Sequence, residues 1–117
     1  EKGGQWVKGK SCDTFGPLGP YLVTKDEIKD INNLNLSLEV NGKRHQTGNT
    51  SLMIFNFNYL ISHLSNFMTL MPGDIITTGT PPGVGLGMSP PKFLKNGDEM
   101  YLKVDNLGEQ KSKVITE

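Results

Sequence analysis

The clearest pattern along the chain is a strict alternation of apolar and polar residues from position 34 to position 40. A period of two places every second side chain on the same face of a β-strand, so this stretch predicts a half-buried strand. Asn41-Gly42 follows directly, and this dipeptide favours a two-residue hairpin turn because both residues tolerate a positive φ. We therefore expect a return strand over 43–46.

A second pattern repeats at helical spacing. Its apolar members are Phe57, Leu60, Ile61, Leu64, Phe67 and Met68. Separations of three and four residues place such side chains on one face of an amphipathic helix. Asn56 or Asn58 is suited to begin this helix, and Pro72-Gly73 lies beyond its end.

Shorter patterns complete the expected architecture. The run 74–78 is β-branched and predicts a strand, and 21–24 is a weaker strand candidate. Met100, Leu102 and Val104 alternate with polar residues, so we expect a strand there that returns over 111–115. Segments 1–20 and 79–87 are rich in glycine or proline and are expected to be loops. The sum predicts a strand-dominated α+β fold with one main amphipathic helix.

Composition narrows the function classes. The chain has 117 residues, with 12 basic and 12 acidic side chains and a formal net charge of zero. A nucleic-acid-binding domain normally carries a basic stripe, and none is present, so we expect no nucleic-acid partner. No apolar run approaches membrane-spanning length, so no membrane partner is expected either. A single cysteine, Cys12, excludes a disulfide framework, and a reducing, cytoplasmic location is the simplest interpretation.

Two segments offer candidate chemistry. The loop 79–87 lacks the Gly-Lys-Ser/Thr of a phosphate-binding loop, and its glycine spacing is not that of a dinucleotide site. Its backbone N–H groups, with the Thr80 hydroxyl, could hold a carboxylate, or the loop could be a plain rigid turn. Lys10 lies in a second glycine-containing segment, where it could supply a cation to a ligand or remain a solvated surface lysine.

Six motifs in a fixed order resemble the fumarylacetoacetate hydrolase family. They are residues 9–15 with 17–20, then 40–42, 46–50, 72–76, 78–85 and 94–98. Each motif is weak alone, but the ordered set is specific and covers almost the entire chain. The stretch 79–87 with Pro90-Pro91 is most similar to members that act on 2,4-diketo-3-deoxy sugar acids, many of them called ureidoglycolate lyases. Cys12 departs from the phenylalanine of many relatives.

This resemblance implies a fold and a cofactor. The family fold is a mixed β-roll with few helices, and its members are usually homodimers. They bind Mg²⁺ or another divalent cation through three carboxylates that precede the segment resembling 9–15, and a lid with a His-Glu pair also lies upstream. The resemblance therefore implies that 1–117 is a partial catalytic domain without the metal ligands and the lid, so no metal ligand is assigned within it.

The resemblance also implies site residues and a reaction. Lys10 matches the catalytic lysine, Gly79 and Thr80 match the region that binds the substrate carboxylate, and Gln46 has a supporting place. The implied reaction is metal-dependent hydrolysis of a C–C bond in a small 2,4-diketo acid of the acylpyruvate type, which releases pyruvate through an enolate. The alternatives are an isomerase, a decarboxylase or a ureidoglycolate lyase on a related acid, or a non-catalytic fragment or dimerisation module.

Overall fold

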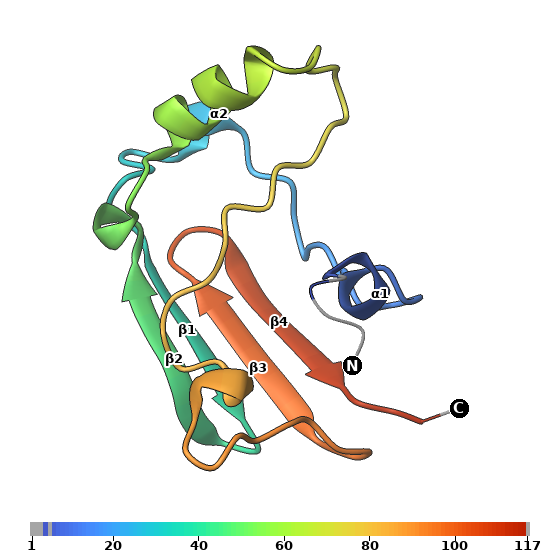
Figure 1. The fold of residues 1–117 in the computed structure, drawn as a ribbon. Coiled ribbons are helices and arrows are strands. Elements are labelled where there is room, and N and C mark those ends of the chain that lie inside the picture. The colour runs from blue at the N-terminus through green and yellow to red at the C-terminus, as the bar shows by residue number, and fades with distance from the viewer. Residues whose placement is uncertain (1–3, 5, 117) are drawn as a thin grey trace.

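The structure, a computed structural model, describes residues 4 and 6–116 and contains one four-stranded antiparallel sheet (Figure 1). The helices and strands are, in chain order, α1 (Trp6–Lys10), β1 (Asn35–Val40), β2 (Lys43–Asn49), α2 (Phe57–Ser65), β3 (Glu99–Val104) and β4 (Gly108–Lys113). Three 3₁₀ turns, η1 (Lys25–Glu27), η2 (Thr50–Leu52) and η3 (Gly85–Gly87), lie between them. The strand order is β2-β1-β3-β4, which confirms the strand-dominated α+β fold.

The first hairpin forms where the alternating pattern predicts it. Asn41 and Gly42 have φ values of 51° and 73°, as a type I′ turn requires. β2 continues beyond the expected end at Gln46, because β1 offers it a partner as far as the pair Asn35↔Asn49. A bulge between Leu38 and Glu39 shifts the register near the turn, and Leu38 pairs with Gln46 just before it.

The second hairpin begins its return strand earlier than expected. β4 starts at Gly108, directly opposite Val104, rather than at residue 111. The turn is tight because Asn106 and Gly108 both adopt a positive φ, at 62° and 91°. β1 pairs with β3, so the two hairpins share one continuous sheet.

Helix α2 begins where predicted, but it ends before Phe67 and Met68, the last apolar residues of the predicted helix. The Asn56 side chain accepts a hydrogen bond from the Tyr59 N–H at 2.9 Å and so caps the helix. The helix ends at Ser65, because the Ser65 hydroxyl and the Asn66 amide both donate to the Ser62 carbonyl. Such side-chain bonds compete with the next helical turn. None of the helices described here is long and apolar enough to cross a membrane.

Three expectations about local structure are wrong. Segments 21–24 and 74–78 run without a strand partner among the described residues, although their composition favours strands. The preference of β-branched residues for strands reflects packing on a sheet, and neither segment forms a backbone ladder with a described strand, although Tyr21 lies against Gly108 of the edge strand β4. In the predicted loop 1–20, Trp6–Lys10 instead forms α1, a helix of five residues.

The sheet has one apolar and one polar face. The apolar face carries Leu36, Leu38, Val40, Met100, Leu102 and Val104, which share a side through the register of β1 and β3. Among the described residues, Leu34 is the one buried apolar side chain, whereas Leu22 and Ile54 are more than 90% exposed. The sheet and helices therefore do not enclose a core of their own.

Candidate functional site

Gln46 brings the loop after α2 onto the sheet. Its side chain lies on the apolar face of β2 and is 8% exposed, so its polar atoms need partners. Its Nε2 donates to Thr80 Oγ1 at 2.8 Å and to the Pro81 carbonyl oxygen at 2.6 Å. A carbonyl oxygen only accepts, so the second bond fixes which end of the amide faces the loop. Two of the residues singled out from the sequence, Gln46 and Thr80, are thus in direct contact.

Glycines allow the loop to lie this close. A Cβ on Gly48 would lie 2.8 Å from the Pro81 Cβ, and a Cβ on Gly83 would overlap the His45 carbonyl oxygen. Gly83 also has a φ of 109°, which side chains with a Cβ rarely adopt. Sequence reasoning missed Gly48, although a glycine inside a strand often marks close backbone approach and was the available signal.

Gly83→Ala is expected to lower the free energy of unfolding by roughly 3 kcal/mol, combining backbone strain with overlap against His45. The measurement is a denaturant midpoint of the protein that carries this sequence. Gly97→Ala is the matched control, because Gly97 has a φ of 90° and the added Cβ would meet no atom within 4 Å in the part of the chain that the structure describes. The free energy of unfolding of Gly97→Ala should fall by roughly 1 kcal/mol, from backbone strain alone. Equal losses in the two variants would show that the loop does not press on β2.

Gly79 and Thr80 are open to solvent on the side of the loop that does not contact Gln46. Both residues are exposed, and no atom of the described residues lies within 4 Å of the Cβ position of Gly79, which has a φ of 91°. The Thr80 oxygen accepts from Gln46, and among residues 4 and 6–116 no acceptor is recorded for its own proton. An anionic ligand at this point would therefore meet a free hydroxyl donor beside a glycine backbone.

A groove adjoins the anchored loop. It encloses about 870 Å³ between the apolar face of the sheet and the loop that includes η3. Leu38, Val40 and Met100 line its floor, and Val84, Pro91 and Phe93 line its wall. Gln46 and Gly83 also line it, together with charged residues such as Lys43 and Asp98, so a partly apolar space of the size of a small molecule lies beside the loop that Gln46 holds.

Lys10 is not brought to this loop by the described residues. It is the last residue of α1, it is exposed, and no hydrogen bond or ion pair of its side chain is recorded within residues 4 and 6–116. Figure 1 places α1 beyond β4, whereas the loop 79–87 lies over the β2 side of the sheet. The two predicted parts of the site, Lys10 at the end of α1 and Thr80 in this loop, thus lie toward opposite edges of the sheet.

The described residues do not fit a metal site. Across residue 4 and residues 6–116, no group of three or more His, Cys, Asp or Glu side chains is placed to hold a metal ion. Metal ions of the Mg²⁺ class need several carboxylate or carbonyl oxygens that converge. A divalent cation would require ligands other than these.

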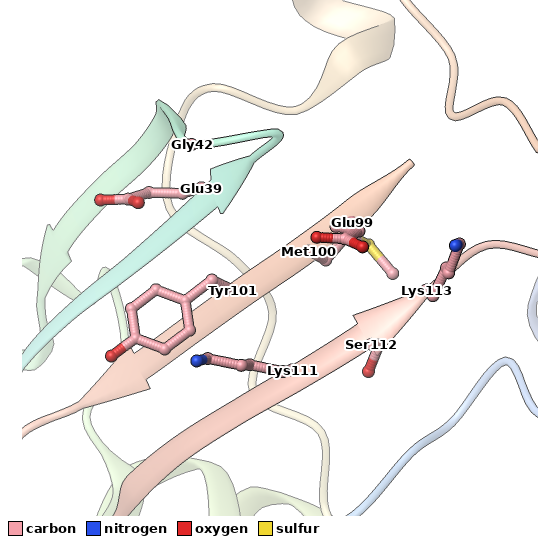
Figure 2. A pocket seen from close by; sticks show the side chains of 8 residues that line it. All are labelled: Glu39, Gly42, Glu99, Met100, Tyr101, Lys111, Ser112 and Lys113. Carbon is pink, nitrogen blue, oxygen red and sulfur yellow. The ribbon is translucent and has the colours of Figure 1, made fainter. Parts of the chain in front are cut away.

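A second hollow lies on the polar face of the sheet (Figure 2). Lys111 points toward Tyr101, with its Nζ 5.4 Å from the ring centre. Hydrogen bonding with Glu109 raises the pKa of the Tyr101 phenol and lowers the pKa of the Glu109 carboxyl. Both shifts move these groups away from neutral pH, so neither is suited to exchange protons there. This hollow is a less suitable active site than the Thr80 loop.

The sequence of this chain matches a known protein family and several curated proteins. A family model described as the C-terminal part of fumarylacetoacetate (FAA) hydrolase matches residues 1–115. A Burkholderia ambifaria protein with only a provisional hydrolase name is 60% identical over 111 residues, which are 94% of this chain and 39% of that protein. The chain therefore spans about two fifths of the length of the curated relatives it matches.

Three solved structures share the fold. A fumarylacetoacetate hydrolase from Exiguobacterium antarcticum is 39% identical, with a TM-score of 0.91 over 94% of this chain and 39% of that one. A maleylpyruvate hydrolase from Sphingobium sp. SYK-6, in complex with manganese(II) and pyruvate, is 39% identical, with a TM-score of 0.80 over 88% and 36%. A 5-carboxymethyl-2-hydroxymuconate delta-isomerase from Mycobacterium smegmatis is 40% identical, with a TM-score of 0.85 over 99% and 42%.

Proposed function

The chain belongs to the fumarylacetoacetate hydrolase family, and on that premise we propose that the protein carrying it hydrolyses a C–C bond in a small 2,4-diketo acid of the acylpyruvate type. In this reaction water adds to the C4 carbonyl, the C3–C4 bond breaks, and the electron pair passes to C3 as an enolate. Protonation at C3 then gives pyruvate and a carboxylic acid. The contact between Gln46 and Thr80 is the observation that carries the proposal, because it fixes a donor for the substrate carboxylate.

The loop contributes binding and orientation. The Thr80 hydroxyl donates to the C1 carboxylate of the substrate, and the open backbone at Gly79 lets that carboxylate approach closely. Holding one end of the substrate sets the distance between its C4 carbonyl and the attacking water. The acyl group then extends toward the apolar groove beside Val84 and Phe93.

Lys10 is proposed to stabilise the negative charge that develops on the enolate. A fixed cation aimed at that charge lowers the barrier because it needs no reorganisation during the reaction. In the structure, Lys10 is exposed beyond the β4 edge of the sheet, whereas the Thr80 loop lies toward the β2 edge. The proposal therefore requires that other parts of the protein complete the site between them.

A divalent cation is part of this proposal, with ligands beyond the described residues. The Sphingobium maleylpyruvate hydrolase with bound manganese(II) and pyruvate supports such a cofactor for this chain as well. Mg²⁺ and Mn²⁺ both take oxygen ligands and both remain candidates. No step is assigned to the cation, since no cluster of three or more His, Cys, Asp or Glu side chains among residues 4 and 6–116 is placed to hold it.

An isomerase is the second candidate function. The Mycobacterium smegmatis delta-isomerase is as similar in sequence to this chain as the hydrolases are. Isomerisation and decarboxylation of related acids would pass through similar anions, so the Thr80 loop would serve them equally well. The non-catalytic alternative remains only for the chain taken alone, without the rest of a site.

Assembly and location complete the proposal. We expect a homodimer in the cytoplasm, and the many exposed apolar side chains, Trp6 and Phe15 among them, suit a chain that packs against further protein. The mass of the protein in solution measures its oligomeric state directly, and a monomer at micromolar concentration would contradict the dimer.

The test of the reaction is product analysis. The longest form of the protein that carries this sequence is incubated with acetylpyruvate and Mn²⁺, and the products are identified by NMR. Equal amounts of pyruvate and acetate are expected. A rearranged acid of unchanged mass would indicate the isomerase, and loss of CO₂ from oxaloacetate without acetylpyruvate cleavage would indicate the decarboxylase; either result would contradict the hydrolase.

A further inference from the structure

The hydrogen bonds of Gln46 determine the direction in which Thr80 can bond. The Pro81 carbonyl only accepts, so the atom of Gln46 that lies 2.6 Å from it is the amide nitrogen. The same nitrogen lies 2.8 Å from Thr80 Oγ1, so its second proton goes to Thr80. The Thr80 oxygen is thereby committed as an acceptor toward β2.

A hydroxyl has one proton, and the bond from Gln46 leaves that proton unused. Thr80 is exposed, and within the part of the chain that the structure describes no acceptor for its proton is recorded. If Gln46 were an acceptor instead, the Thr80 proton would turn toward β2 and a lone pair would face the open side. The polarity of one buried amide thus decides which partner the hydroxyl prefers.

We propose that Gln46 is a positioning residue that holds Thr80 as a hydrogen-bond donor and so makes the loop selective for a carboxylate over a neutral or cationic group. This inference rests on the proposed function, because it concerns the same Thr80 loop. Gln46 does not touch the substrate; it acts through Thr80. The Gln46 side chain is only 8% exposed, and its amide nitrogen donates two hydrogen bonds to the loop. Together these constraints keep the amide from rotating.

Gln46→Glu reverses the polarity with almost no change of shape. If the new carboxyl is ionised, its oxygen accepts the Thr80 proton. If it is protonated, its one proton goes to the Pro81 carbonyl, and the same oxygen still accepts from Thr80. Both forms therefore withdraw the donor from the ligand. Gln46→Met only removes the bond and leaves the Thr80 hydroxyl free to turn, so its effect should be smaller.

The experiment measures pyruvate affinity by calorimetry, with Mn²⁺ present, in the longest form of the protein. The proteins compared are the wild type, Gln46→Glu, Gln46→Met, Thr80→Val and the double variant Gln46→Glu/Thr80→Val. Gln46→Glu and Thr80→Val should each weaken binding about tenfold or more, as expected for loss of one charge-assisted hydrogen bond. In the Thr80→Val background, Gln46→Glu should add less than about twofold, because coupled residues are not additive.

A matched control comes from the same face of the sheet. Gln110 lies on β4, where the one side-chain hydrogen bond recorded for it within residues 4 and 6–116 is to the Gly19 carbonyl at 3.5 Å, so Gln110→Glu repeats the chemical change away from the loop. Pyruvate affinity should be unchanged in this variant. Thermal unfolding of every variant shows whether the fold is retained, and Gln46→Met keeps the comparison usable if Gln46→Glu unfolds.

The outcomes separate this inference from the reaction. If Gln46→Glu weakens pyruvate binding equally in the wild-type and Thr80→Val backgrounds, the role of Gln46 is purely structural and the inference is overturned. Equal affinities in wild type and Gln46→Glu would overturn it as well. The expected coupling, found in a protein that does not cleave acetylpyruvate, would support the inference while contradicting the hydrolase reaction. A wild type that binds no pyruvate would overturn both.

Discussion

Removal of divalent cations with EDTA is expected to reduce pyruvate release from an acylpyruvate by roughly 10³-fold or more. A divalent cation held by such an enzyme would supply Lewis-acid stabilisation of developing negative charge, typically worth several kcal/mol. The described residues of this chain contain no cluster of three or more metal-ligating side chains, so the proposed cation would need ligands elsewhere in the protein. The measurement is the initial rate of pyruvate formation before and after chelation.

Restoration by metal distinguishes cofactor loss from damage. Adding Mn²⁺ or Mg²⁺ in excess of the chelator should recover the rate, and a thermal unfolding curve taken in EDTA should show that the protein remains folded. A rate that is undiminished in EDTA, with metal content verified by elemental analysis, would remove the cation from the proposed function.

Lys10→Ala is expected to lower kcat at least about 10²-fold, by comparison with the loss of one electrostatic stabiliser of a developing oxyanion. The effect should fall on kcat more than on KM, because the enolate charge that Lys10 is proposed to stabilise is absent from the ground state. Stability should change little, since Lys10 is exposed and has no recorded polar partner among the described residues. The measurement is steady-state kinetics with an acylpyruvate.

Lys8→Ala is the matched control for Lys10. Both lysines lie on α1 and both are exposed, so loss of charge from the helix is the same in the two variants. Lys8→Ala should retain wild-type kcat. If both variants behave alike, a general electrostatic effect of α1 would replace the catalytic role, and near-normal turnover of Lys10→Ala would remove it.

Features that depend on neighbouring residues were predictable from the sequence. Asn41-Gly42 determines its own turn, and the alternation before it determines which side of β1 is apolar. The start of α2 was predictable for the same reason, because Asn56 caps a backbone N–H only three residues away. The end of α2 depended on bonds from Ser65 and Asn66 that apolar periodicity does not register.

Features that depend on distant partners were not predictable. The run 74–78 has the composition of a strand, but a strand also needs an edge to pair with, and periodicity carries no information about that edge. The contact between Gln46 and Thr80 joins residues 34 positions apart. Spacing alone left Thr80 with two interpretations, and the family resemblance, rather than any local pattern, marked Gln46 beside it.

The close fit of the loop on β2 has a consequence for how this site can evolve. Gly48 and Gly83 have no room for a side chain, so substitutions there threaten the fold before they can change what is bound. Val84 and Phe93 line the groove beside this loop, with 43% and 68% of their surfaces exposed. A scan of all single substitutions should therefore find tolerance, and altered acyl-group preference, concentrated at these two positions. New specificities would arise by exchanging the side chains of the loop while its glycine backbone stays constant.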